Sequence, residues 1–237
     1  MTLRPSIVLF SLALALLGPT GVVAAPPGGG TQRLTGSGAP FVRQMLAVVA
    51  GAQHLHIRSS VEIRVKRPDT APRLLHTTLD VAWAPGNRFH AESASTPRAL
   101  IVGTGHTTYI YYPDQNRYTV PPEDKAAAFA SYVRSQATVL SPQSPTAWQY
   151  LGVRTIQGYS CDLVVGHGNG STETLYLDRH VHLPRKVVTT RSSNHSSTSI
   201  EAEFTTLDVN HPLPDRLFRF TPPAGVHRMD APSRSAE

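Results

Sequence analysis

Few residues in this 237-residue sequence have the types and spacing that chemistry requires. Two histidine pairs, His54-x-His56 and His180-x-His182, could each place two imidazoles on one face of a strand. A zinc site needs further ligands and an outer layer of hydrogen bonds to orient them, and neither pair has a cysteine or acidic cluster of suitable spacing nearby. We therefore expect surface or turn histidines, with no metal and no cofactor.

The nucleophilic side chains are equally isolated. Cys161 is the single cysteine, and its place beside Leu163 on the apolar side of a strand predicts a buried, unreactive thiol. Ser160 lies in Gly-Tyr-Ser-Cys-Asp, which lacks the second glycine of a nucleophile elbow and precedes a strand rather than a helix. We therefore predict that the protein is not an enzyme, and a hydrolase is the alternative with the least support.

The first 24 residues have the composition of a signal peptide. Arg4 supplies a basic start, residues 7–17 form an apolar run, and small residues lead up to Ala24. The run is shorter than the ~20 apolar residues of a transmembrane helix. We expect cleavage after Ala24, no transmembrane segment in the mature chain, and a periplasmic or otherwise exported protein. One cysteine forms no internal disulfide, so stability must come from a hydrophobic core.

Charge and composition limit the partners and define the domain. The chain has 22 basic and 16 acidic residues, a net charge of +6, and the basic residues are scattered. A nucleic-acid surface would show basic runs interleaved with aromatic residues, so we expect no nucleic-acid partner. Residues 25–38 read as a disordered leader, 39–228 as a single domain and 229–237 as a disordered tail. We expect a monomer.

Hydrophobic spacing predicts two helices and two series of strands. Apolar residues at three- and four-residue spacing predict helices over 40–53 and 123–137. A period of two predicts strands over 56–66, 75–83, 88–94, 99–103, 107–112 and 116–120. The stretch 147–151 could form a helical turn. A second series of strands follows over 152–157, 160–166, 172–177, 185–190 and 199–209.

These elements predict an α+β fold. Its sheet would be curled and antiparallel, an incomplete β-barrel (half-barrel) covered by two or more α-helices. Such a sheet either packs a solid core or encloses a cavity. We expect Cys161 and Leu163 to share one inward face with Leu175 and Leu177. The inward-facing candidates for a ligand-binding wall are Val61, Ile63, Leu79, Val81, Trp83, Ile101, Tyr109, Tyr111, Leu175 and Leu177.

Three motifs resemble those of a known family. A strand ends in Tyr111-Tyr112-Pro113-Asp114. Another, Leu-Tyr-Leu-Asp at 175–178, is followed by a turn and Leu-Pro-Arg-Lys at 183–186. Residues 207–223 close on Leu-Pro-x-x-x-Phe-x-Phe-x-Pro-Pro. These motifs are similar to those of uncharacterised predicted periplasmic proteins related to the outer-membrane lipoprotein carriers, the LolA/LolB-like superfamily. The resemblance covers residues 40–228.

The resemblance implies a half-barrel with an apolar concavity that takes acyl chains. We therefore expect a carrier-like protein that holds a hydrophobic ligand, such as a lipid or acyl chain, in this cavity. The alternative is an envelope sensor or interaction module that binds another envelope protein. An open apolar cleft would favour the carrier, whereas a filled interior would favour the interaction module.

Overall fold

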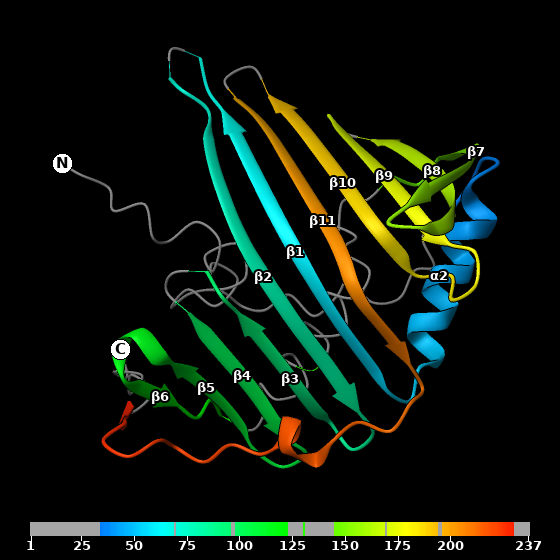
Figure 1. Ribbon diagram of the computed structural model, residues 1–237. Coiled ribbons are helices and arrows are strands. Elements are labelled where there is room, and N and C mark those ends of the chain that lie inside the picture. Colours follow the sequence, from blue (N-terminus) through cyan, green and yellow to red (C-terminus); the bar gives the residue numbers. More distant parts are fainter. Residues whose placement is uncertain are drawn as a thin grey trace, which may run out of the picture.

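The structure is a computed structural model that describes residues 34–68, 70–95, 98–122, 130, 145–168, 170–193 and 196–229. These residues form one twelve-stranded sheet and the α-helix α2 (Ala39–Gly51) (Figure 1). The strands are β1 (Leu55–Lys66), β2 (Arg73–Ala84), β3 (Arg88–Ser93), β4 (Ala99–Thr104), β5 (Thr108–Tyr112), β6 (Arg117–Thr119), β7 (Trp148–Ile156), β8 (Tyr159–Gly168), β9 (Ser171–Asp178), β10 (Pro184–Ser193), β11 (Ser196–Val209) and β12 (His227–Met229). Two short 3-10 helices, η3 (Pro113–Gln115) and η5 (Asp215–Phe218), complete the fold.

The order of the strands shows how the two predicted series meet. Neighbours in the sheet follow the order β12-β6-β5-β4-β3-β2-β1-β11-β10-β9-β8-β7. The first series runs outward from β1, and the second runs inward to β11, which pairs with β1 in the middle. All pairs are antiparallel except β12 with β6, which is parallel. Within the described ranges no ladder joins β7 to β6 or β12, so the curled sheet remains open, as expected for an incomplete barrel.

Helix α2 forms where the sequence predicted the first helix. Pro40 lies in its first turn, where the fixed φ and missing N–H of proline are tolerated. Val42 and Met45 are buried and join the main hydrophobic cluster of the sheet. The second predicted helix, over 123–137, lies outside the described residues except for Ala130, which is helical and packs on the same cluster. Helical covering of the sheet is therefore described for α2 and Ala130 only.

We call the face of the sheet that packs against α2 the inner face, and the opposite one the outer face. On β1 the odd-numbered residues from Leu55 to Val65 belong to the inner face. The register with β11 contains a bulge in which Thr205 is the extra residue. This bulge shifts the inner-face positions of β11 from Leu207 to the even-numbered Phe204. The inner face therefore stays apolar although the alternation in the sequence changes phase.

The N-terminal end of the described chain pairs with the start of β7. Thr35 forms a parallel bridge with Ala147, and its carbonyl accepts a hydrogen bond from the Trp148 N–H at 2.9 Å. Gly36 has a φ of +86°, and a Cβ there would lie 2.2 Å from the Trp148 carbonyl oxygen, so this close approach requires glycine. Because β7 begins at Trp148, the idea of a helical turn over 147–151 is wrong.

Tyr109 and Tyr111 lie on the outer face of the sheet and not on the inner face that the sequence predicted. The C-terminal segment covers them there. Ile110 pairs with Ile101 on the inner face, so Tyr109 and Tyr111 project to the outer face. There the ring of Phe220 lies 5.0 Å from the Tyr109 ring and 5.7 Å from the Tyr111 ring. These tyrosines therefore lie opposite the inward wall on which the sequence pattern had placed them.

A similar difference occurs on β8. Val164 pairs with Leu175 and belongs to the same inner-face cluster, whereas Cys161 pairs with Asp178. Because side chains alternate along a strand, Cys161 and Leu163 face outward. The prediction that they share a face with Leu175 and Leu177 is therefore wrong by one residue of phase, although Cys161 is buried as expected.

Candidate functional site

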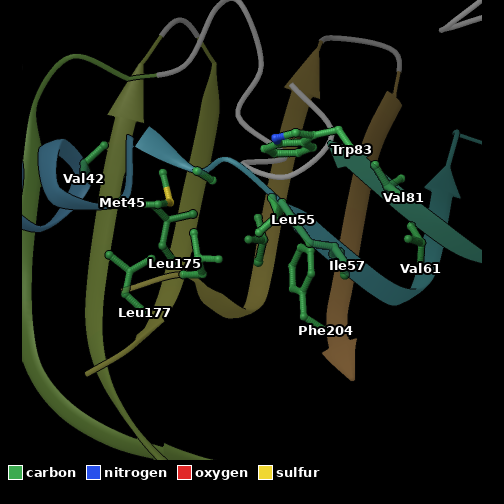
Figure 2. Packing of buried hydrophobic residues seen from close by; sticks show 14 of the residues in the cluster. Val42, Met45, Leu55, Ile57, Val61, Val81, Trp83, Leu175, Leu177 and Phe204 are labelled. Atoms are coloured by element: carbon green, nitrogen blue, oxygen red, sulfur yellow. The ribbon is translucent and has the colours of Figure 1, made fainter. Parts of the chain in front are cut away.

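The inner face gathers most of the residues that the sequence predicted for a binding wall. Val61, Val81, Trp83, Ile101, Leu175 and Leu177 belong to the main hydrophobic cluster, and Ile63 and Leu79 pack against it. Figure 2 shows Val42 and Met45 of α2 together with Leu175 and Leu177 in this cluster. Tyr109 and Tyr111 are the two candidates that lie elsewhere. The candidate site is therefore the inner face without these two tyrosines.

Cross-strand register arranges the inner-face residues of β2, β1 and β11 in rows. In order along the strands, the rows are Trp83, Leu55 and Val209; Val81, Ile57 and Leu207; Leu79, Ser59 and Phe204; Thr77, Val61 and Ala202; Leu75, Ile63 and Ile200; and Arg73, Val65 and Thr198. We call the first two rows the closed end and the last two the open end. Val65 lies ten residues beyond Leu55, which corresponds to about 33 Å along an extended strand.

Burial changes from one end of these rows to the other. At the closed end Leu55 is 0% exposed and Trp83 is 2% exposed. At the open end Leu75 is 40% exposed, and Ile63 and Val65 are only partly buried. Figure 1 shows why: the β1–β2 and β10–β11 hairpins extend beyond the ends of β3 and β4. One continuous apolar face is thus covered at one end and accessible at the other.

The inner face also carries a small group of hydroxyls. Ser59, Thr77 and Ser93 are all buried, and they come from the neighbouring strands β1, β2 and β3. The Thr77 and Ser93 hydroxyl oxygens lie 3.4 Å apart, and the Ser93 and Ser95 hydroxyl oxygens lie 2.7 Å apart. Such contacts satisfy polar groups that burial would otherwise leave unpaired. The wall is therefore apolar with one polar strip near its middle.

The outer face of β1 and β2, next to the closed end, carries an ion-pair network. Asp80 Oδ1 lies 2.7 Å from His56 Nε2, and Asp80 Oδ2 accepts hydrogen bonds from Arg58 Nε at 3.0 Å and Arg58 Nη2 at 2.5 Å. Burial opposes ionisation of Asp80, but the hydrogen bonds from His56 and Arg58 outweigh it and lower its pKa to about 2. The predicted histidine pair His54-x-His56 therefore contributes one imidazole to a structural ion pair.

The Leu-Pro-Arg-Lys motif forms a buried structural turn between β9 and β10. Asp178 Oδ1 accepts hydrogen bonds from the N–H groups of His180 at 2.7 Å and Val181 at 3.3 Å, and Oδ2 accepts one from Arg185 Nε at 2.8 Å. The Arg185 guanidinium carbon lies 3.6 Å from the centre of the Tyr159 ring. Burial opposes ionisation of Asp178, but these hydrogen bonds lower its pKa. The motif that identified the fold thus holds a turn in place.

Two open pockets in the described chain lie outside the inner-face wall. One, of about 540 Å³, surrounds this turn and is lined by Gly158, Tyr159, Ser160, Asp178, Arg179, His180, Val181 and Arg185. The other, of about 450 Å³, lies beside η5 and is lined by Arg88, Thr104, Tyr109, Asp215, Phe218, Arg219, Phe220 and Thr221. The charged groups in both are already engaged in ion pairs, such as Arg88 with Asp215 at 3.1 Å.

The residues considered for chemistry lie apart from one another. Cys161 is 0% exposed, and burial raises its pKa to about 11, so it is a thiol at neutral pH. His182 occupies a turn with a φ of 57°. In the part of the chain that the structure describes, no three His, Cys, Asp or Glu residues are grouped as a metal ion would require. None of the described helices has the length and apolar character to cross a membrane.

The class of protein defined by these features is an open half-barrel with an apolar inner face. Residues 125–231 match the family described as "Predicted periplasmic protein (DUF2092)". This match confirms the resemblance to predicted periplasmic proteins and the predicted periplasmic or otherwise exported location. A search of the curated proteins found no match.

Several solved structures are similar to this chain. An uncharacterized conserved protein from Thermus thermophilus has 12% identity and a TM-score of 0.47, over 80% of this chain and 96% of its own. LprF from Mycobacterium bovis has 12% identity and a TM-score of 0.43, over 74% of this chain and 93% of its own. A LolA superfamily protein from Nitrosomonas europaea has 12% identity and a TM-score of 0.31, over 76% of this chain and 96% of its own.

Proposed function

We propose that this exported protein is a binding or carrier-like protein that holds a hydrophobic ligand, a lipid or acyl chain, against the inner face. The observation that carries the proposal is the change in burial along one apolar face. Ile57 is 3% exposed, whereas Leu75, on the same face of the neighbouring strand, is 40% exposed. Apolar surface that remains exposed to water gains about 25 cal/mol per Å² when a ligand covers it.

The shape of the face suits reversible binding of a chain. Its rows cross the strands, so a chain lying parallel to the strands would contact first the row of Val61 and then the row of Ile63 and Leu75. Each buried CH₂ contributes roughly 0.8 kcal/mol, so a single chain can bind tightly without a covalent bond. The open end supplies a route for entry and release. Binding of this kind needs no catalytic group.

Two neighbouring leucines provide a sharp test. Leu75 projects to the inner face, whereas Leu74, 48% exposed, projects to the outer face of the same strand. We expect Leu75→Asp to weaken binding of a neutral acyl ester, measured by displacement of a fluorescent hydrophobic probe, by roughly tenfold, because a buried leucine contributes about 1.5–3 kcal/mol. Leu74→Asp is the matched control and should bind like the parent protein.

Native mass spectrometry of the protein purified from its own periplasm completes the test. The proposal predicts a co-purifying amphiphile that is lost from Leu75→Asp and retained by Leu74→Asp. Equal effects of the two substitutions, or the absence of any amphiphile together with no probe binding, would contradict it.

One observation favours a second candidate function, an envelope interaction module. β7 is an edge strand, and Leu151 and Val153 on it are 42% and 40% exposed. Among the described residues, pairing along this edge is limited to its first part, through the bridge from Thr35. An extended segment of another envelope protein could add a strand to the remainder, and the exposed apolar side chains would give it specificity.

A pull-down distinguishes the two functions. An interaction module should retain one stoichiometric protein partner after delipidation, and the double substitution Leu151→Lys with Val153→Lys should abolish that binding. Leu74→Lys, which alters an exposed leucine on a hairpin far from this edge, is the control. Loss of the partner on delipidation alone, or an equal effect of the control, would count against this second function.

A further inference from the structure

We infer that the open end of the inner face carries a basic rim that takes the anionic head group of an amphiphile. The inference rests on the proposed function and names the class of its ligand. The outermost row of the inner face continues across four strands, from Arg73 on β2 through Val65 and Thr198 to Arg191 on β10. Two guanidinium groups thus flank the apolar face where it meets solvent.

The position of the two arginines follows from the sheet register. Arg73 pairs with Val65, Val65 with Thr198, and Thr198 with Arg191, so all four share one face. β2 and β10 are three strand spacings apart, or about 14 Å at ~4.8 Å per strand. Both arginines are exposed, and the row behind them consists of Leu75, Ile63, Ile200 and Thr189. A chain lying along the inner face would therefore bring its head group between two cations.

The surrounding charges favour an anion. Arg67 continues the rim into the β1–β2 turn and is exposed, whereas Lys66, the last residue of β1, projects to the outer face. The sequence places one acidic residue, Asp69, in this turn. On the inner face the nearest acidic residue along the strands is Glu173, which is 1% exposed and pairs in register with Thr189. Counted together, Arg73, Arg191 and Arg67 outnumber Asp69 and the buried Glu173 by three charges to two, so the rim keeps a net positive charge.

Guanidinium groups match the geometry of carboxylate and phosphate oxygens, because each presents N–H donors in a planar fork. The shared chemistry is thus a carboxylate or phosphate head on an acyl or alkyl chain. A neutral head of the same chain length would occupy the same apolar rows but gain nothing from the rim. The structure therefore assigns a preference for anionic over neutral amphiphiles to Arg73 and Arg191.

Three probes of matched chain length test this inference: palmitate, hexadecyl phosphate and methyl palmitate. At neutral pH and low salt the parent protein should bind the two anions about fivefold more tightly than the ester, since each exposed ion pair contributes modestly. The double variant Arg73→Gln with Arg191→Gln should bind all three alike, with affinity for the ester unchanged. Added salt should reduce the preference of the parent protein.

The control is Arg64→Gln, because Arg64 lies one residue from Val65 on the same strand but on the outer face, with its side chain 61% exposed. It should retain the full preference. A parent protein that binds all three probes equally, or a double variant that keeps the preference, overturns the inference and leaves the proposed function standing. Failure to bind any of the three overturns both. Preference for only one of the two anions identifies the head group.

Discussion

The closed and open ends of the inner face are built from the same strands and differ in what packs on them. At the closed end Leu55 and Ile57 are buried in the cluster that includes Met45 of α2. At the open end Ile63 and Ile200 pack only against the edge of this cluster. The free energy of folding is thus concentrated at one end, and the other end can present apolar surface to a ligand without holding the fold together.

The largest expected difference in the free energy of unfolding lies between two aspartates. Asp178 is buried at the β9–β10 turn, and Asp208 is partly exposed on β11. Asp178→Ala leaves the buried Arg185 without its carboxylate and removes the acceptor of two turn N–H groups, so we expect it to lower the free energy of unfolding by about 4 kcal/mol. Asp208→Ala, which removes an exposed pair with His211, should cost less than about 1 kcal/mol. Urea unfolding of both variants measures this, and equal effects would contradict it.

Two isoleucines on β1 compare the ends directly. Ile57→Ala at the closed end should destabilise delipidated protein by about 3 kcal/mol, because it leaves a cavity in a packed cluster. Ile63→Ala at the open end should cost about 1 kcal/mol, because that side chain is only partly buried. Because the substitution, the strand and the face are the same, any difference in stability between the two variants reports how tightly each end is packed. Equal losses in urea unfolding would show that the open end is as tightly packed as the closed end.

The smallest expected effect is a pH dependence of the free energy of unfolding. It comes from Asp80 on the outer face of the sheet. Asp80 has a folded pKa of about 2, below its ordinary value of 3.8. A carboxyl group with a lowered folded pKa stabilises the fold above the unfolded pKa, and this stability is lost as the pH falls toward the folded value. The contribution is about 2 kcal/mol at neutral pH.

The variant Asp80→Asn tests this assignment. Its deficit in free energy of unfolding relative to the parent protein should be largest at pH 7 and should shrink as the pH falls from about 4 toward 2. Urea midpoints at several pH values measure the deficit. A deficit that is constant with pH would assign the stabilising charge to another residue.

The sequence predicted the sheet best where one face meets water. On β1 and β2, charged residues such as Arg58 and Asp80 alternate with apolar ones, so the inner face could be assigned from spacing alone. On β5 and β8 the sequence pattern assigned the wrong residues to the inner face, because other side chains cover both faces of these strands. Phe220 packs over Tyr109, and Cys161 is as buried as Val164, so neither strand keeps a polar face to mark the outside.

Two further features of the site could not be read from spacing. The bulge at Thr205 lies in a run of polar and apolar residues that gives no signal of an extra residue, yet it decides that Phe204 faces inward. The basic rim depends on Arg73 and Arg191 sharing one register row, although they are far apart in the sequence. Both are consequences of strand pairing, which periodicity along a single strand does not contain.

The bridge at Thr35 and the strand β12 lie at opposite borders of the open sheet. Fluorescent labels on the variants' cysteines, Thr35→Cys and Arg228→Cys, would therefore report the distance between the two borders of the open half-barrel. The native cysteine, Cys161, would not interfere, because it is 0% exposed and its pKa is about 11. Energy transfer between the two labels, recorded while palmitate is added, would show whether these borders move apart.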